Sequence, residues 1–281
     1  MIRLIEPGQR RKIGVKELVT ISGSNGVVSS AINTLFLSAP HSEHHLLAAH
    51  PTPSPPSLNH YVHLSYQDLS IHLSKSTLYS FSNQLIQHPE QTGFALTFLN
   101  ITHSLSKLVL GTGARRILTT PNAGGSSVWS EALSFELLYR LVGATLVKTE
   151  MELTYSRRGS PITDYACQVA KATVGVSVTR AMAFKRPFEK QDAIRLLTKK
   201  LKGINMSSTT VTNCTFARQI LHVWTQSGHD AAIVRRAWRK LPLSLCSNTI
   251  ILVTSVNSPL LFFEKQTAVK EKKPKPFKKW Y

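Results

Sequence analysis

Carboxylate side chains in the middle of the chain have a spacing that could bind a divalent cation. Glu131 falls in the first two turns of an expected helix, and Asp164 falls near the start of an expected strand. Lys148, Glu150 and Glu152 alternate, so they would lie on one face of another strand. Mg²⁺ prefers hard oxygen ligands and often takes one or two carboxylates, with water and phosphate completing the octahedron. We therefore expect Glu131, Asp164 and one of Glu150 or Glu152 to hold Mg²⁺ or Mn²⁺.

A cation close to these acids could contact a phosphate group. Lys148 or Arg180 would meet the scissile phosphate of a bound substrate. The alternative for Lys148, Glu150 and Glu152 is a solvated strand face on which opposite charges stabilise cross-strand pairing. His222 could be a proton carrier or a hydrogen-bonded core histidine. The residues leave these alternatives open.

The elements that would position these side chains follow from periodicity. Apolar residues recur at helical spacing from Val128 to Val142, Ser126 or Ser127 could be the N-cap, and Gly143 ends the helix. Strand patterns follow over residues 144–155, 162–170 and 174–179. Further along are a helix over 188–201 closed by Gly203, a strand over 218–225, a helix over 230–241 and a strand over 248–256. This order predicts an α/β fold with one mixed sheet flanked by helices.

The αβββαβ order, with Glu131 on the first helix and Asp164 on the second strand, resembles the PD-(D/E)XK superfamily of restriction-endonuclease-like nucleases and resolvases. The strings SEALSFELL, KTEME, TDY and GVSVTRAM are also similar to a little-characterised eukaryotic group placed with that fold. The resemblance covers about residues 120 to 260. It implies that Glu131 and Asp164 hold Mg²⁺. On the third strand the chain departs from the family, because Ser177-Val178-Thr179 stands where an acid-x-Lys motif is expected.

The flanking segments are less regular. Residues 1–58 are basic and then rich in His, Ser and Pro, which predicts a poorly ordered segment ending in a linker. Residues 59–118 are expected to be a helical lead-in, with a short strand over Tyr61 to Leu69, an amphipathic segment over Leu73 to His88 and a helix over Ala95 to Leu110. The string from Gly111 to Arg116 is expected to be a basic turn. The restriction-endonuclease-like core is expected over 119–262 and a disordered basic tail over 263–281.

Charge and cysteine content limit the class of protein. The 281 residues contain 34 Lys+Arg against 15 Asp+Glu, a formal net charge of +19 that favours a polyanionic partner. Three widely spaced cysteines predict neither a disulfide framework nor a zinc site. No apolar run approaches the ~18 residues of a membrane span, so we expect a soluble chain.

Basic side chains outside the acid cluster could bind nucleic acid. Arg235 and Arg239 share a helix face, and the tail combines seven lysines with aromatic residues that could stack on bases. Lysine-rich runs also serve as nuclear import signals, whereas the basic N-terminal segment could be a mitochondrial presequence. The residues expected to bind nucleic acid are Arg157, Arg158, Arg180, Arg235, Arg239, Lys272 and Lys273.

The sequence supports three hypotheses. The first is metal-dependent hydrolysis of DNA phosphodiester bonds, with DNA favoured over RNA and with a homodimer required for a resolvase-like role. The second is a catalytically inactive nucleic-acid-binding or scaffold protein that retains the nuclease fold. The third is a mitochondrial or ribosome-associated structural protein for which the basic charge is sufficient. Convergence of Glu131, Asp164 and a third oxygen ligand would distinguish the first hypothesis from the others.

Overall fold

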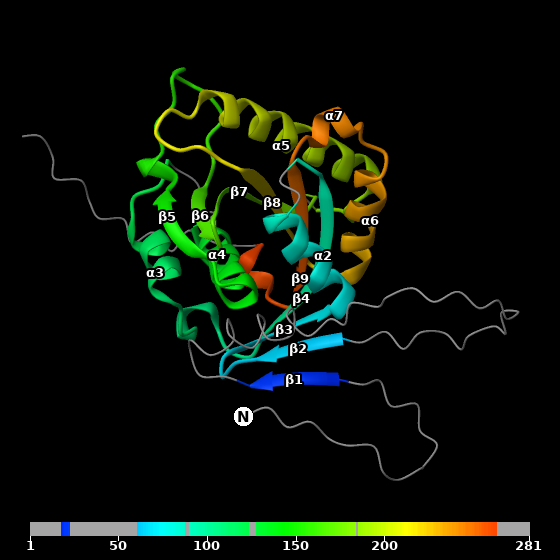
Figure 1. Cartoon of the computed structure of the whole chain (residues 1–281). Helices are drawn as coiled ribbons and strands as arrows, with labels where there is room; N and C mark the ends of the chain where they lie inside the picture. The colour runs from blue at the N-terminus through cyan, green and yellow to red at the C-terminus, as the bar shows by residue number, and fades with distance from the viewer. Residues whose placement is uncertain (1–17, 23–60, 88–89, 124–127, 184, 263–281) are drawn as a thin grey trace, which may run out of the picture.

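The computed structural model describes residues 18–22, 61–87, 90–123, 128–183 and 185–262 (Figure 1). Within these residues nine strands form one sheet in the order β1-β2-β3-β4-β9-β8-β7-β6-β5. The strands are β1 (Leu18–Ser22), β2 (Tyr61–Ser65), β3 (Leu69–Ser74), β4 (Gly93–Ile101), β5 (Thr145–Thr149), β6 (Tyr165–Val169), β7 (Ala172–Ala181), β8 (Arg218–Thr225) and β9 (Thr249–Val256). The sheet is mixed: β4, β9, β8 and β7 are parallel neighbours, whereas β5, β6 and β7 pair antiparallel. The predicted α/β fold with a mixed sheet flanked by helices is confirmed.

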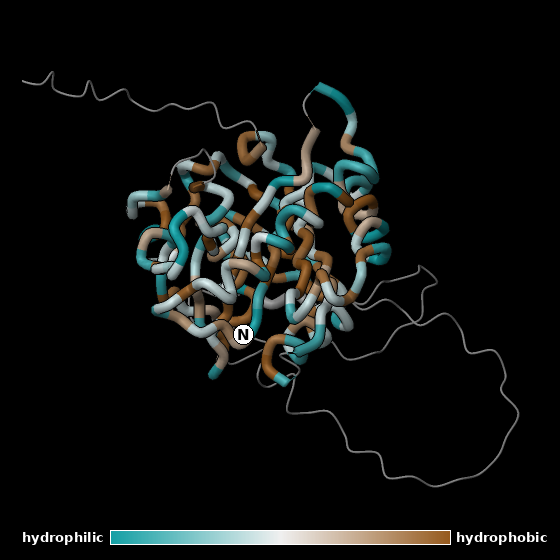
Figure 2. The backbone as a smooth tube through the Cα atoms, turned by 90° about the horizontal axis from the view of Figure 1, so that it is seen from above, coloured by the Kyte–Doolittle hydropathy of each residue, from teal (hydrophilic) through white to brown (hydrophobic). Residues whose placement is uncertain are grey.

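Helices cover both faces of the sheet. They are α2 (Lys75–Ile86), α3 (Thr112–Thr119), α4 (Val128–Val142), α5 (Lys190–Thr210), α6 (Gly228–Trp238) and α7 (Leu243–Cys246), with 3-10 turns η1 (Leu105–Lys107), η2 (Glu150–Glu152) and η3 (Pro259–Leu261). One apolar cluster joins α2, α3 and α4 to the sheet, and a second joins α5, α6 and α7 to the opposite face. The apolar segments accordingly concentrate toward the middle of the molecule (Figure 2). No described helix is long and apolar enough to cross a membrane.

Strands β9 and β8 are the fifth and sixth of the nine strands in the sheet. Every residue in both is buried. Their side chains alternate between the two clusters: Ile220 and Trp224 pack beneath α4, whereas Leu221 and Val223 pack beneath α5 and α6. A strand covered on both faces is typically rich in apolar residues on both sides. The strands predicted over 218–225 and 248–256 are therefore confirmed to within one residue.

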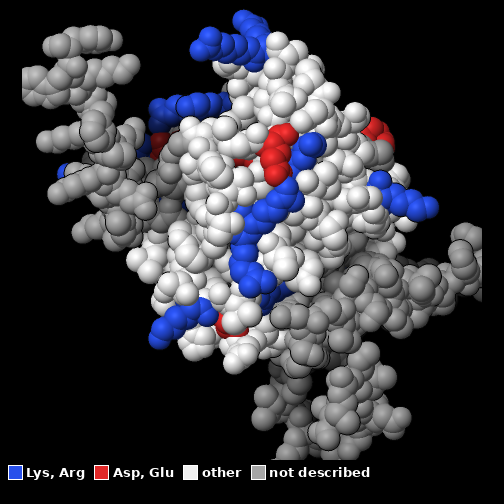
Figure 3. All heavy atoms as spheres, turned by 90° about the vertical axis from the view of Figure 1, so that its left-hand side faces the viewer, with Lys and Arg blue, Asp and Glu red and all other residues white. Residues whose placement is uncertain are grey.

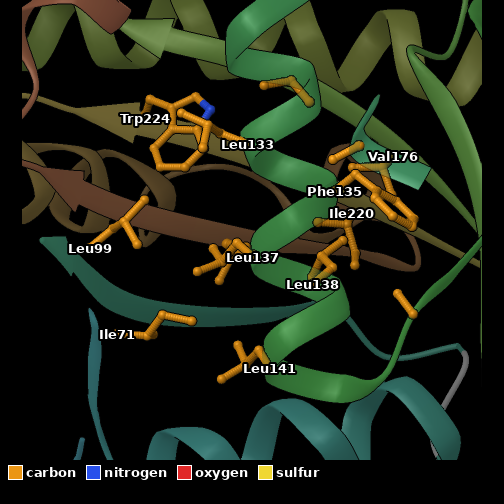
Figure 4. Close-up of a cluster of buried hydrophobic side chains, with 14 of the residues drawn as sticks. Ile71, Leu99, Leu133, Phe135, Leu137, Leu138, Leu141, Val176, Ile220 and Trp224 are labelled. Atoms are coloured by element: carbon orange, nitrogen blue, oxygen red, sulfur yellow. The ribbon is translucent and has the colours of Figure 1, made fainter. Parts of the chain in front are cut away.

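Helix α4 lies across the face formed by β7, β8, β4 and β3 (Figure 4). Leu133, Leu137, Leu138 and Leu141 are each at most 2% exposed, and burying one leucine side chain contributes ~1.5–3 kcal/mol. Gly143 follows the helix with φ = 66°, a left-handed conformation that suits glycine and ends the helix as predicted. The predicted N-cap, Ser126 or Ser127, lies outside the described residues.

A buried ion-pair cluster fixes α4 to the segment that precedes it. Arg140 donates from Nε to Oε1 of Glu136 at 2.7 Å and from Nη1 to Oδ1 of Asp68 at 3.1 Å. The remaining carboxylate oxygens accept backbone N–H groups, from Gly111 to Glu136 and from Val109 to Asp68. Because the three charged side chains are nearly fully buried, this cluster ties β3 and the 105–111 connection to α4.

Several expected elements are wrong. Residues 59–118 contain the expected short strand, as β2, and a helix, α2, within the expected amphipathic segment. They are no purely helical lead-in, because β2, β3 and β4 extend the sheet beyond β9. The helix expected over Ala95 to Leu110 is strand β4 followed by η1. Alternate residues of β4 are buried, so the strand period prevails over the leucine spacing that suggested a helix.

Two further boundaries differ from the expectation. Helix α5 continues past Gly203 to Thr210, because Ile204 and Ser207 also face the core. The basic turn expected at Gly111–Arg116 is the N-cap and first turn of α3. Residues 1–17, 23–60 and 263–281 lie outside the described residues, so the order expected for the two ends of the chain stays a prediction.

Candidate active site

Glu131 is held at one end of the sheet by the first turn of α4. The side chain is 5% exposed, and the N-terminus of a helix favours a negative charge. Trp224 Nε1, on the central strand β8, donates to the backbone oxygen of Ser130 at 3.1 Å. This bond fixes the first turn of α4 against the end of β8, and with it the position of Glu131.

Asp164 lies directly before β6, at the same end of the sheet. Its N–H donates to the carbonyl of Val176 at 3.1 Å, and its Oδ2 accepts the N–H of Val178. The residue is partly exposed, but its carboxyl group is closely surrounded by protein atoms. Desolvation, together with the charge of Glu131, raises the pKa of Asp164 to about 7.

Glu150 supplies a third carboxylate from η2. Burial, followed by repulsion from Glu131, raises the pKa of Glu150. The backbone N–H of Ala123 donates to this side chain and acts in the opposite direction. Glu150 also contributes to the raised pKa of Asp164, after burial and Glu131. The carboxylates of α4, η2 and the start of β6 are therefore close enough to repel one another.

Lys200 is the cation that the structure brings to these acids. Its Nζ, on α5, donates to the carbonyl of Val178 at 3.3 Å. Burial and Glu131 raise the pKa of Asp164, and the charge of Lys200 opposes them without outweighing them. Val178 is the middle residue of the Ser177-Val178-Thr179 departure. A lysine thus reaches this stretch of β7 from α5.

Glu152 and Lys148, also expected in the acid site, have other contacts. The strand expected over 144–155 ends at Thr149, so Glu152 does not continue its face. Glu152 instead accepts the N–H of Thr149 at 2.8 Å and pairs with Arg116, and these bonds lower its pKa. Burial raises the pKa of the Cys214 thiol, and the charge of Lys148 opposes this shift. Lys148 therefore lies close enough to Cys214 to act on it.

The residues expected to bind nucleic acid are dispersed. Arg180 lies on β7 and its Nη1 donates to the carbonyl of Leu261 at 3.0 Å. Arg157 and Arg158 are exposed in the turn between η2 and β6. Arg235 and Arg239, also exposed, lie at the end of α6, which covers the face opposite α4. Lys272 and Lys273 lie outside the described residues.

The surface at the β5 edge carries several basic side chains. Figure 3 shows a short run of Lys and Arg side chains near the middle of this face, beside an Asp or Glu group, and further ones toward its margins with uncharged surface between. The basic side chains therefore do not cover this face.

His222 belongs to the core. Its Nδ1 lies 2.7 Å from Ser134 Oγ and its Nε2 lies 2.8 Å from Thr254 Oγ1. Ser134 Oγ also lies 2.7 Å from the Tyr165 hydroxyl, and Thr254 Oγ1 lies at the same distance from Thr97 Oγ1. Burial lowers the pKa of His222 to about 3, so the ring is neutral at physiological pH. Of the two alternatives, the hydrogen-bonded core histidine is correct.

Two residues of the site were absent from the sequence-based set. Lys200 is one of several lysines on α5, and its spacing does not distinguish it from the exposed ones. Tyr155 accepts the N–H of Thr163 at 2.8 Å, and Asp164 and Glu150 help to raise its pKa, after the larger effect of burial. The position of Tyr155 depends on the η2 turn, whereas the alternating pattern of the sequence predicted a continuous strand there.

Glu131, Asp164 and Glu150 supply the oxygen ligands that Mg²⁺ prefers. Within the described ranges no group of three or more His, Cys, Asp or Glu side chains is arranged to hold a metal ion. Mg²⁺ needs only one or two carboxylates. Buried acids that repel one another, and whose pKa values are raised by that repulsion, are the environment that a divalent cation would stabilise. Glu131 and Asp164 would be its ligands, with Glu150 in reach through water.

Comparison with known proteins identifies one similar chain without a stated activity. No family model and no solved structure matches the sequence. The chain is similar to the AAC-rich mRNA clone AAC4 protein of Dictyostelium discoideum, with 42% identity over 174 residues. The match covers 59% of this chain and 25% of that protein, so the chain spans about a quarter of that protein's length. The name indicates no ligand or reaction, so the function has to be inferred from the geometry of the site.

Proposed function

We propose that this chain is a metal-dependent nuclease of the PD-(D/E)XK type that hydrolyses DNA phosphodiester bonds. The proposal is supported chiefly by the mutual repulsion of Glu131, Glu150 and Asp164, which belong to three separate elements and raise the pKa values of Glu150 and Asp164. The order α4-β5-β6-β7-α5-β8 also supports it, because this is the αβββαβ order that the resemblance implies. Parallel β7, β8 and β9 end on the same side, where α/β proteins commonly bind ligands.

Each residue has a role that follows from its contacts. The Val178 N–H holds one oxygen of Asp164, so the other oxygen is available to a cation. Glu131 would be the second ligand, and Glu150 would orient a water molecule. When bound, Mg²⁺ polarises the phosphate and lowers the pKa of a coordinated water. Lys200 would donate to a phosphate oxygen or to the attacking water from the α5 side.

Cleavage of labelled DNA tests the proposal. Duplex, single-stranded and four-way-junction DNA would be incubated with Mg²⁺ or Mn²⁺ and the wild type, Asp164→Asn or Glu131→Gln. We expect cleavage by the wild type and a loss of at least ~10²-fold in either variant, since each removes a charge that acts in the transition state. Glu152→Gln is the matched control and should cleave like the wild type. Equal cleavage by wild type and Asp164→Asn would refute the assignment.

A second candidate function is nucleic-acid binding without catalysis. It is favoured by Ser177 on β7, which is 4% exposed and stands at the position where the superfamily expects a carboxylate. A hydroxyl at that position is a weaker ligand for Mg²⁺ than a carboxylate oxygen. DNA binding without cleavage of any of these substrates would favour this function.

A further inference from the structure

Hydrogen bonds between buried polar side chains cross the core beneath helix α4. Ser134 Oγ, on α4, lies 2.7 Å from His222 Nδ1, on β8, and 2.7 Å from the Tyr165 hydroxyl, on β6. The bonds continue from His222 Nε2 to Thr254 on β9, and from Thr254 to Thr97 on β4. We refer to these five fully buried residues as the core network. Within it, Ser134 bonds α4 to both β8 and β6.

Ser134 lies within one helical turn of the first proposed metal ligand. It is three residues after Glu131, and residues three apart are neighbours on one side of a helix. Directly before Glu131, the carbonyl of Ser130 accepts the Trp224 Nε1–H at 3.1 Å. Trp224 and His222 are two residues apart on β8, and their ring centroids are 4.3 Å apart. Strand β8 therefore holds α4 at two points, one before and one after Glu131 in the sequence.

Tyr165 connects the same network to the second proposed ligand. It directly follows Asp164 and is the first residue of β6. Its hydroxyl bonds to Ser134, and its ring packs edge-on against Phe135 of α4 with the ring centroids 5.8 Å apart. The bond between Ser134 and Tyr165 is therefore a direct link between the helix that carries Glu131 and the strand that Asp164 precedes.

These bonds restrict the position of α4 more closely than its apolar contacts do. Apolar burial is non-directional, so leucine contacts tolerate small shifts of a helix along a sheet. A hydrogen bond is satisfied only over a narrow range of distance and angle, and a buried polar group that loses its partner costs free energy. The position of α4 matters at the acids, because metal ligation tolerates deviations of only ~0.2 Å.

We propose that Ser134 is a positioning residue of the acid site, and that its bonds to His222 and Tyr165 hold Glu131 and Asp164 at the separation that a divalent cation requires. The inference rests on the metal site of the proposed function, but it does not depend on cleavage. It gives His222 a task as a hydrogen-bonding partner of α4. The outer members of the network, on β9 and β4, bond to that histidine from strands further from β6.

Binding of Mn²⁺ alone by the full chain tests the inference, with electron paramagnetic resonance as the readout. Ser134→Ala removes the shared hydroxyl, and Tyr165→Phe removes one bond but keeps the ring. We expect either variant to bind Mn²⁺ at least ~10-fold more weakly, because losing an outer hydrogen-bonding partner typically costs ~10–100-fold in metal affinity. The bound Mn²⁺ should also give broader spectral lines, since its ligands are held less uniformly.

Thr97→Val is the matched control. It removes a fully buried hydroxyl that makes a 2.7 Å bond in the same network, on a strand that is not next to either acid-bearing element. This variant should lose folding stability as the others do, yet keep its Mn²⁺ affinity within ~2-fold. Circular dichroism would establish that each variant is folded under the binding conditions.

A double variant tests whether the two side chains act through one bond. Ser134→Ala combined with Tyr165→Phe should bind Mn²⁺ no more weakly than Ser134→Ala alone, because the bond between them is already lost. If Ser134→Ala does not fold, Tyr165→Phe decides the question. Wild-type Mn²⁺ affinity in the folded Ser134→Ala and Tyr165→Phe variants would overturn the proposal, and so would an equal loss in Thr97→Val.

Three outcomes separate this inference from the proposed function. If the wild type binds Mn²⁺ in a manner that depends on Ser134 but never cleaves DNA, the nuclease function fails and the positioning role stands. If the wild type cleaves, Ser134→Ala should need ~10-fold more Mg²⁺ for half-maximal cleavage and approach the wild-type kcat at saturating Mg²⁺. A reduced kcat with an unchanged Mg²⁺ requirement, or no Mn²⁺ binding by the wild type, would contradict the inference.

Discussion

Asp164 combines two unfavourable environments for a carboxylate, namely burial and repulsion from Glu131 and Glu150. The bond from Val178 and the charge of Lys200 compensate only in part, since the pKa is still raised to about 7. Such a residue reduces folding stability and is retained more readily where it has a function. The pH dependence of stability should reveal this cost.

Asp164→Asn should stabilise the protein at alkaline pH. The folded pKa lies above the unfolded value, so the folded state binds the extra proton between about pH 4 and 7. The stability contributed by the protonated form is present below the unfolded pKa and is lost as pH rises through 7. The free energy of unfolding of the variant should exceed that of the wild type by roughly 2–4 kcal/mol at pH 8, a range that is discounted for the partial exposure of Asp164. The two free energies should be equal near pH 4. Urea unfolding at both pH values measures this, and a difference independent of pH would contradict the assignment.

Lys200→Gln should change the pH dependence of activity. Without the ammonium, the pKa of Asp164 rises further, so in the free enzyme the acidic limb of the kcat/KM profile should move to higher pH. Lys199→Gln is the matched control, because Lys199 is exposed on the same helix. Both profiles would be measured with the cleavage assay. An identical acidic limb in wild type and Lys200→Gln would show that the lysine does not act on Asp164.

At this scale the sequence placed Glu131, Asp164 and Glu150 among the candidate ligands, because an acid in a first helical turn and acids near strand ends are visible in the pattern; their role as ligands stays a prediction. It misplaced Glu152, since the choice between a strand and the η2 turn depends on the capping bonds at Thr149. It missed Lys200 because contact with Val178 depends on how α5 packs on β7. That packing is a tertiary property with no local signal.

Helix α4 packs on one face of the sheet (Figure 4). It carries Glu131 in its first turn and Arg140, part of the buried ion-pair cluster, in its last turn. Its sequence shows apolar residues at helical spacing and a closing glycine, which is why it could be predicted. The partners of Arg140 could not, because Asp68 is 72 residues away in the chain.

Arg140→Met should be strongly destabilising. Removing the guanidinium leaves Asp68 and Glu136 buried without their cation, which typically costs ~3–5 kcal/mol. Arg116→Met is the control. The side chains of Arg116 and Glu152, which form an ion pair, are 46% and 35% exposed, so the loss of folding stability should stay below ~1 kcal/mol. Chemical denaturation of both variants measures the difference. Similar losses would mean that the Arg140 cluster contributes little.

Two glycines in helices should respond oppositely to alanine. At Gly113 in α3 an added Cβ would lie 2.3 Å from Cε1 of Phe135, so Gly113→Ala should destabilise by ~1–3 kcal/mol through overpacking. At Gly203 in α5 the nearest atom to an added Cβ would be Pro161 Cβ at 3.5 Å, so Gly203→Ala should stabilise by ~0.5–1 kcal/mol. Thermal unfolding would compare them, and destabilisation by both would indicate that Gly203 is required within α5.

For the whole molecule, the sequence predicted the class and the central strands but not the extent of the sheet. The β-branched and apolar residues of β8 and β9 marked these strands in the sequence. The short strand expected over Tyr61 to Leu69 corresponds to β2, whereas β3 and β4 were missed. Strand β4 joins β9, about 150 residues later in the chain, and this pairing has no local signature. The net charge of +19 applies to the whole chain, and much of the basic sequence lies beyond the described residues.

The most direct test of the proposed metal site is the binding of Mn²⁺ by the full chain, measured by electron paramagnetic resonance. We expect one Mn²⁺ per chain that Mg²⁺ displaces. Binding should be lost in a Glu131→Gln, Glu150→Gln, Asp164→Asn triple variant and kept in Glu152→Gln. Equal binding by the wild type and the triple variant would contradict the claim that these three acids form a metal site.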